Sequence, residues 1–410
     1  MEDPHKGALS RRSVLTATGA GFAAALGAPI PFLANLPAGV LPVALAQASP
    51  AGKSGLVALG DRPLVMETPP HLLDDEITPA KFFFVRNNGQ IPDVANATDE
   101  TWRLKLDGEV ATPLDLSIAE LKREFEPASL RLVIECAGNG RKFYRPSGAG
   151  NQWTFGGVGC AEWTGVRLKD LLARAGVKPS AVYTGHYGAD AHLSGAPGRA
   201  ALSRGMPIAN ALEPHTLVAW AMNGENIPVL NGHPLRLVAP GLPGSCSQKW
   251  LTRIWVRDRV HDGEKMQGQS YRLPAYPVPP GASVPDDDMA IIEDIPVKSL
   301  ITFPQTGASA KLGRAIAVRG HAWSGAVEAA KVELSLDFGA SWAPAALAPA
   351  PNRFAWRRFT AAVTPPQRGY YEIWARATDA AGKAQPPAPP GWNPQGYLNN
   401  QQHRVAVFVT

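Results

Sequence analysis

The chain has 410 residues, of which 45% are hydrophobic and 18% are charged. This balance excludes an intrinsically disordered chain, and the length indicates two or three domains. The formal net charge of +5 comes from scattered Lys and Arg residues, without the basic run that would follow a nucleic-acid backbone. We therefore expect a globular protein that does not bind nucleic acid.

The first 46 residues carry the features of an export signal. Arg11 and Arg12 precede an apolar stretch rich in Ala and Gly, and Ala44-Leu45-Ala46 offers a cleavage site of small residues. This pattern is typical of a twin-arginine signal peptide, which exports proteins already folded around a cofactor. The alternative is an N-terminal membrane anchor, although Gly and Pro interrupt the apolar run. We expect a periplasmic protein with no membrane span after signal removal.

The next predicted elements are strands and a helix. Residues 102–106 alternate with period two and meet Asp107-Gly108, which is a hairpin turn signal. Ser117 and Glu120 form a capping box, which predicts a helix with Ile118, Leu121 and Phe125 on one face.

Further elements alternate without a regular strand–helix–strand repeat. Residues 131–135 form a short apolar run that predicts a buried strand ending at Cys136, and residues 166–175 predict an amphipathic helix ending at Gly176. Residues 235–238 and 251–256 predict two more strands. This mixture indicates an α+β domain over residues 47–284.

From residue 285 onward the pattern becomes purely β. Residues 331–337, 371–377 and 405–409 alternate apolar and polar side chains, and turn residues separate them. The proline-rich residues 272–310 predict a passage between domains with a boundary near residue 285. We therefore predict an immunoglobulin-like β-sandwich over residues 285–410 that offers a surface for dimerisation.

Cys136 is the strongest single candidate for chemistry. It stands where an apolar strand meets the sequence Ala-Gly-Asn-Gly-Arg, and such a junction lets the backbone approach a ligand. Arg141 could favour the thiolate, which is the form that binds soft metals. The alternative is a structural cysteine buried in a turn.

Several motifs, taken in chain order, resemble those of the sulfite oxidase family of molybdopterin enzymes. They are 84–88 (Phe-Val-Arg-Asn-Asn), 135–141 (Glu-Cys-Ala-Gly-Asn-Gly-Arg), 232–238 (Gly-His-Pro-Leu-Arg-Leu-Val), 248–251 (Gln-Lys-Trp-Leu), Trp392-Asn393 and Asn399. The resemblance extends from about residue 65 to residue 410. It is greatest to haem-free bacterial periplasmic sulfite dehydrogenases, with the sulfane dehydrogenase subunit of the sulfur-oxidising system as a near relative.

The resemblance implies a molybdenum–molybdopterin cofactor, no haem in this chain, and Cys136 as the thiolate ligand of the metal. Arg86 and Arg141 match the two arginines of the sulfite pocket, and Tyr271 matches the active-site tyrosine. Asp190 matches a polar contact to the pterin. The remaining cofactor contacts implied in this way are Phe84, Val85, Arg86, Asn87, Asn88, Asn231, Arg236, Ser247, Gln248 and Lys249.

The sequence departs from the vertebrate pattern of this family at three positions. Asn88 and Asn231 replace histidines, and both retain hydrogen-bonding capacity without a titratable ring. Gln395 stands where a further pocket arginine is usual. The loss of that cation predicts weaker sulfite affinity or a shift in the preferred anion.

The resemblance implies oxidation of sulfite to sulfate by oxygen-atom transfer, with electrons passed singly to an external c-type cytochrome, in a homodimer. A first alternative is a sulfane dehydrogenase subunit, which would oxidise protein-bound sulfur with a cytochrome partner. A second is a non-enzymatic secreted binding module with an adhesive immunoglobulin-like part. Metal analysis separates the second alternative from the enzymes.

Overall fold

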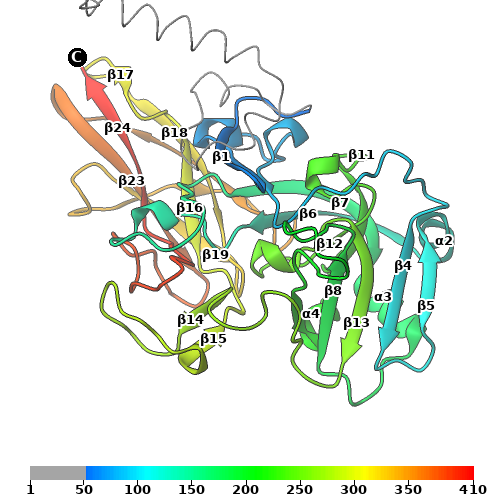
Figure 1. Ribbon diagram of the computed structural model, residues 1–410. Helices are drawn as coiled ribbons and strands as arrows, with labels where there is room; N and C mark the ends of the chain where they lie inside the picture. The colour runs from blue at the N-terminus through cyan, green and yellow to red at the C-terminus, as the bar shows by residue number, and fades with distance from the viewer. Residues whose placement is uncertain (1–51) are drawn as a thin grey trace, which may run out of the picture. The chain divides into compact units, whose positions relative to one another are not determined.

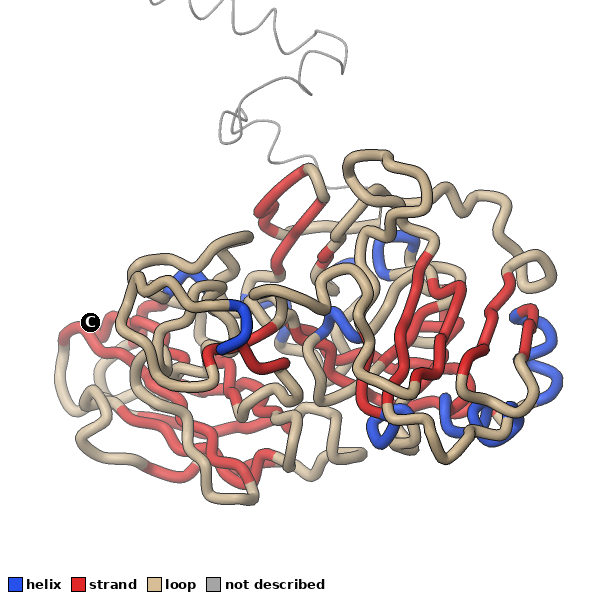
Figure 2. Tube along the Cα trace, turned by 60° about the horizontal axis from the view of Figure 1, so that its bottom comes forward, coloured by secondary structure: helices blue, strands red, loops and turns tan. Residues whose placement is uncertain are grey.

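The computed structural model describes residues 52–410, and these residues belong to one compact unit. The signal peptide predicted over residues 1–46 lies outside the described residues. Strands predominate, and the helices are few and short (Figure 2). None of the helices in residues 52–410 has the length and hydropathy that a bilayer-spanning segment requires. The α-helices are α2 (Ile118–Glu124), α3 (Leu168–Ala175) and α4 (Ile208–Ala211).

Three sheets make up the first half of the described chain (Figure 1). One has the order β5 (Leu114–Ser117), β4 (Arg103–Gly108), β13 (Leu251–Arg257), β8 (Tyr183–Gly188) and β9 (Gly205–Pro207). Another has the order β11 (Glu225–Asn226), β10 (Leu217–Met222), β7 (Val158–Arg167) and β6 (Pro127–Glu135), with β12 (Arg236–Val238) paired to β10. The smallest has the order β1 (Val57–Asp61), β2 (Leu64–Glu67) and β3 (Val85–Arg86).

The two larger sheets share a hydrophobic core with helices α2 and α3. Leu106 from β4, Ile118 from α2 and Leu171 from α3 are buried in it together with Val218 from β10. A separate cluster on residues of β6, β7 and β10 contains large aromatic side chains, among them Trp163. Cys136 belongs to this aromatic cluster, so the predicted metal ligand lies at the edge of a rigid core.

The second half is a two-sheet β-sandwich. One sheet has the order β16 (Lys298–Phe303), β18 (Ile316–Trp323), β22 (Arg357–Val363) and β21 (Ala346–Leu347). The other has the order β17 (Ala308–Ala310), β24 (His403–Val409), β23 (Gly369–Asp379), β19 (Ala329–Ser335) and β20 (Ala343–Pro344). Alternate residues of both sheets meet in one buried core, as the period-two pattern predicts, and they include Val318, Phe359, Val332, Ile373 and Val405.

Several predicted elements are present where the local sequence places them. Helix α2 has its capping box, because the backbone N–H of Glu120 donates to the Ser117 hydroxyl at 3.1 Å and the Glu120 carboxylate accepts from the Ser117 N–H at 2.7 Å. Strand β6 ends directly before Cys136, and helix α3 ends at Gly176 in the left-handed conformation.

Other local predictions were wrong. Asp107 and Gly108 continue strand β4 instead of turning, because β4 pairs in parallel with β13 along these residues. Val166 and Arg167 belong to β7 and not to helix α3. Residues 272–310 are more than a passage, since β14 (Arg272–Pro274) and β15 (Met289–Ile291) pair with each other within them.

Candidate active site

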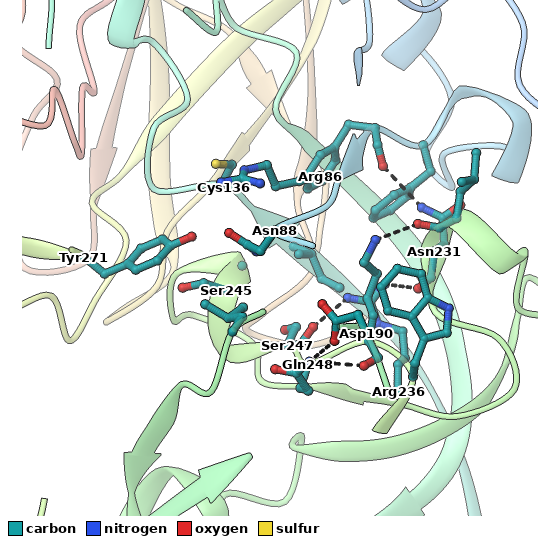
Figure 3. Close-up of a pocket in the computed structure, with 18 residues that line it drawn as sticks. Arg86, Asn88, Cys136, Asp190, Asn231, Arg236, Ser245, Ser247, Gln248 and Tyr271 are labelled. Atoms are coloured by element: carbon teal, nitrogen blue, oxygen red, sulfur yellow. Dashed lines mark hydrogen bonds between the residues drawn. The ribbon is translucent and has the colours of Figure 1, made fainter. Parts of the chain in front are cut away.

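Most of the predicted site residues line one pocket, which encloses about 640 Å³ of empty space that is partly open to solvent. Figure 3 shows Cys136, Arg86, Asn88 and Tyr271 at one end of this pocket, and Asn231 and Arg236 at the other. The predicted residues in the lining are Phe84, Arg86, Asn88, Cys136, Asp190, Asn231, Arg236, Ser247, Gln248, Lys249 and Tyr271. Val85, Asn87 and Arg141 lie outside the lining.

The loop that follows β6 presents Cys136 to the pocket. The Cys136 N–H donates to the Gly157 carbonyl at 2.8 Å, and the Cys136 carbonyl accepts from the Asn139 N–H at 2.9 Å. The Asn139 side chain links the loop back to Glu135 at 2.8 Å and accepts from the Gly157 N–H at 3.0 Å. These bonds hold the thiol, which is 9% exposed, in a defined position.

The C-terminal segment supports the same loop from the β-sandwich side. The Leu398 N–H donates to the Ala137 carbonyl at 2.9 Å, and the Asn399 side chain donates to the Gly140 carbonyl at 2.8 Å. Gly140 has a φ of 92°, and a Cβ there would lie 2.8 Å from the Asn399 side chain. Only glycine meets both requirements, which explains this position of the motif.

Arg141 folds back beneath the loop. Its guanidinium donates to the Gln395 carbonyl at 2.6 Å and to the Asn151 carbonyl at 2.9 Å, and it lies over the ring of Tyr397. Residue Gln395 thus contributes its backbone to holding Arg141. A direct role of Arg141 in binding the substrate anion remains a prediction, because two of its donor directions are already used by the protein.

The far end of the pocket gathers buried cations. Arg236 donates to the Asn231 carbonyl at 2.6 Å and to the Ser247 carbonyl at 3.1 Å, and burial lowers its pKa to about 9. Lys249 donates to the Leu230 carbonyl at 2.9 Å and to the Asn87 side chain. Burial, and secondly the charge of Arg236, lower the pKa of Lys249 well below its usual value.

Lys53 is a member of this cation group that sequence reasoning missed. Its ammonium donates to the carbonyls of Ala80 at 2.7 Å and Phe83 at 2.8 Å, and to the Asn231 side chain at 2.6 Å. Burial lowers the pKa of Lys53 to about 7. No local sequence pattern predicts this contact, because Lys53 and Asn231 are 178 residues apart in the chain.

Asp190 is the carboxylate in the pocket lining. Burial raises its pKa to about 6, although the charges of Lys249 and Lys265 act in the opposite direction. Within residues 52–410, several buried polar atoms at or beside the pocket have no hydrogen-bond partner, namely Asn87 Nδ2, Ser245 Oγ and Gln248 Oε1. Buried polar atoms in native proteins are normally paired, so these atoms point to a polar ligand.

Tyr271 and Trp250 hold unusual backbone conformations at the pocket. Their φ angles are 54° and 49°, in the left-handed region that bulky residues seldom adopt. The Tyr271 ring stacks on the Tyr397 ring at 5.5 Å between centroids. The guanidinium of Arg204 lies over the Tyr271 ring, 4.8 Å from its centroid. In Figure 3 the Tyr271 hydroxyl points toward Asn88 and Arg86.

The other two cysteines are not among the residues that line this pocket. Cys160 and Cys246 are buried, and burial raises the pKa of Cys160 to about 12 and that of Cys246 above its usual value. Across residues 52–410, no three His, Cys, Asp or Glu side chains are arranged to hold a metal ion. Cys136 is therefore the thiol that this pocket offers to a metal.

Comparisons with known proteins agree with this arrangement. Residues 88–265 match the family described as oxidoreductase molybdopterin binding domain, and residues 289–410 match the Mo-co oxidoreductase dimerisation domain. Sulfite oxidase from Gallus gallus is 32% identical over 367 residues, which cover 87% of this chain and 78% of that protein. Mitochondrial sulfite oxidase from Homo sapiens is 32% identical over 376 residues, which cover 88% of this chain and 67% of that protein.

A solved structure, the sulfane dehydrogenase SoxCD from Paracoccus pantotrophus, shares the fold. Its TM-score is 0.69 at 24% identity, over 92% of this chain and 96% of that chain. The fold and the site thus define a molybdenum oxidoreductase. The chain belongs to the sulfite oxidase family of molybdopterin enzymes, which confirms the predicted fold class and the predicted molybdenum cofactor.

The residues present fit such a cofactor. Molybdopterin carries a phosphate and a polar pterin, and the pocket offers Arg236 and Lys249 together with the unpartnered Asn87, Ser245 and Gln248 atoms. These cations repel one another unless an anion lies among them.

The domain boundary predicted near residue 285 stays a prediction, since the described residues 52–410 belong to one compact unit.

Proposed function

We propose that this protein is a periplasmic sulfite dehydrogenase, which oxidises sulfite to sulfate and passes the electrons singly to an external c-type cytochrome. The observation that supports this most is the convergence of Arg86 and Tyr271 with Cys136 at one end of a single pocket. The signal predicted over residues 1–46 supports the periplasmic location. The dimerisation-domain match over residues 289–410 supports a homodimer.

The chain's own residues would hold the cofactor at both ends. The Cys136 thiolate would be the protein ligand of molybdenum, and Arg236 and Lys249 would bind the phosphate of the pterin. Asp190 and Gln248, which lie 3.4 Å apart, would bind polar atoms of the pterin. When bound, the molybdenum cofactor supplies the two-electron oxidation and the oxygen-atom transfer.

The substrate end is built to bind and orient a small oxyanion. Arg86 lines the pocket, and its planar guanidinium can donate two parallel hydrogen bonds to an oxyanion. The Tyr271 hydroxyl, which points toward the same space, would donate to a substrate oxygen and hold a proton during turnover. The Arg86 guanidinium would offset negative charge and the Tyr271 hydroxyl would donate a hydrogen bond where water is partly excluded, so each interaction would be stronger there than in bulk water.

A steady-state assay on molybdenum-loaded protein tests this proposal. We expect sulfite-dependent reduction of ferricyanide and of cytochrome c, and we expect one molybdenum per chain by plasma mass spectrometry. Purified protein without molybdenum would instead favour the secreted binding module.

A sulfane dehydrogenase is the second candidate. The placement of Arg141 favours it, because a guanidinium that donates to two backbone carbonyls has fewer N–H donors left to bind a small dianion. Molybdenum-loaded protein that does not oxidise sulfite, but oxidises a protein-bound sulfane in the presence of a cytochrome, would select this candidate over sulfite dehydrogenase.

A further inference from the structure

Lys265 lies beside the substrate end of the pocket, although no sequence motif drew attention to it. Its ammonium donates to the Asn88 side-chain oxygen at 3.1 Å, and Asn88 lines the pocket. Lys265 is half-buried. A lysine ammonium has three donors, so this contact leaves two of them for further acceptors.

The backbone holds Lys265 in this position. The Arg204 guanidinium donates to the Lys265 carbonyl at 2.9 Å, and the Ser203 N–H donates to the Glu264 carbonyl at 3.1 Å. On the following side, Arg272 donates to the Met266 carbonyl at 3.0 Å. These bonds support a φ of 66° at Lys265, which lies in the left-handed region that a lysine seldom adopts.

Two positive charges therefore approach each other at this end of the pocket. Burial first, and then the charge of Arg86, lower the pKa of Lys265, while Glu264 and Asp190 oppose the shift. Asn88, which accepts the hydrogen bond from Lys265, lies at the same end of the pocket as Arg86 (Figure 3), so both cations face this region and repel each other. A neutral side chain at position 265 would avoid this repulsion. An anion between the two cations would instead be attracted by both of them.

We propose that Lys265 is a specificity-determining cation, which binds the substrate oxyanion together with Arg86 and sets the affinity of the pocket for it. This inference rests on the proposed oxidation of a small sulfur oxyanion. It assigns to Lys265 a part in binding and not in the electron transfer, so its removal should act on KM much more than on kcat.

The kinetic test compares Lys265→Met, Lys265→Arg and Lys105→Met in the holoenzyme. Lys105 is an exposed lysine of β4 paired with Asp107, and it serves as the matched control. Loss of one charge-assisted hydrogen bond to the anion should raise KM for sulfite about tenfold in Lys265→Met. We expect kcat to stay within about twofold, Lys265→Arg to restore most of the affinity, and Lys105→Met to behave as the parent protein.

A turnover-independent measurement separates this inference from the proposed function. Isothermal titration of the holoenzyme with sulfate should give a Kd that is about tenfold higher in Lys265→Met than in the parent protein. That result supports the inference even if sulfite proves not to be the substrate. Equal sulfate affinities in the two proteins, or a parent protein that does not bind sulfate, would overturn it.

Discussion

Cys160 is a matched control for a test of the role of Cys136. The side chains of Cys136 and Cys160 are both buried, but only Cys136 lines the pocket among these two. We expect Cys136→Ser to fold with little change in melting temperature and to lose sulfite turnover by at least about a hundredfold, since even partners of metal ligands contribute 10–100-fold. Cys160→Ala should retain turnover.

X-ray absorption at the molybdenum edge gives an independent measure of the same change. The parent holoenzyme should show one more sulfur around the metal than Cys136→Ser. An unchanged sulfur count, or normal turnover in Cys136→Ser, would contradict the assignment of this thiol as a metal ligand.

Lys53 joins the first described residues of the chain to the cofactor end of the pocket. Lys53→Met keeps about the length of the side chain but removes its three N–H donors. The Ala80 and Phe83 carbonyls and the Asn231 side-chain oxygen then lose their hydrogen bonds from Lys53. We expect the free energy of unfolding to fall by about 1–3 kcal/mol. Because Lys53 also contributes positive charge near Lys249, purified Lys53→Met should contain less molybdenum and pterin per chain.

Lys81 provides the comparison. It is an exposed lysine whose ammonium lies over the ring of Phe82. Lys81→Met should keep the parent content of metal and pterin, measured by plasma mass spectrometry and by fluorescence of the oxidised pterin. Equal cofactor content in Lys53→Met and Lys81→Met would show that Lys53 does not support the site.

At the scale of elements, the end of β6 is tied to two strands of the sandwich. The Glu135 carboxylate accepts from Lys298 of β16 and, at 2.7 Å, from the indole N–H of Trp323 of β18. Both members of the Glu135–Lys298 ion pair are almost fully buried. Since Glu135 directly precedes Cys136, this ion pair also fixes the start of the loop that carries Cys136.

Removal of one member of this pair should be costly. Lys298→Met leaves a buried carboxylate without its cation, and we expect a loss of about 3–5 kcal/mol in the free energy of unfolding by urea. Lys331→Met, at an exposed pair with Glu333, should change stability by less than about 1 kcal/mol. A double variant with Glu135→Gln should recover part of the loss, and a small effect of Lys298→Met alone would contradict the expected role.

Local sequence signals predicted those elements whose determinants lie within a few residues. The capping box of α2 and the apolar run of β6 are of this kind, and the structure places both where they were expected. The continuation of β4 through Gly108 depends on pairing with β13, which is more than a hundred residues away in the chain. The local turn signal at Asp107-Gly108 therefore gave a wrong prediction. Lys53 and Lys265 were missed for the same reason, because their roles depend on contacts across the chain.

Family motifs carried most of the prediction of the site. They predict that Arg86, Cys136 and Tyr271 belong to one site, and all three residues line the pocket. They could not reveal that Arg141 is turned toward backbone carbonyls, since a residue's identity does not determine the direction of a long side chain.

At the scale of the whole molecule, buried histidines make the fold sensitive to acid. Burial lowers the pKa of His186 and His403 to about 3 and that of His261 and His321 to about 4. These side chains bind protons in the unfolded chain near pH 6.5 but not in the folded chain. The free energy of unfolding is therefore not reduced by these histidines above pH 6.5, and it decreases as the pH falls toward 4.

We expect the free energy of unfolding to decrease between pH 6.5 and pH 4, with up to about 1.4 kcal/mol per pH unit from each histidine. His321 stacks on Trp356 at 4.1 Å, so His321→Phe should keep the stacking and reduce the slope by one proton. Urea titrations at several pH values measure the free energy of unfolding, with His192→Gln at a partly exposed histidine as the control. A slope that is the same in His321→Phe and the parent protein would contradict the prediction.

The loop that carries Cys136 meets residues about 250 positions further along the chain, at Gly140 against Asn399 and at Arg141 against Gln395. The two halves of the described chain are consequently not interchangeable parts. A recombinant that joined this first half to the sandwich of a distant relative would place an unmatched segment against Gly140. We expect these positions to be inherited together, and chimeric chains to need both partners from the same parent.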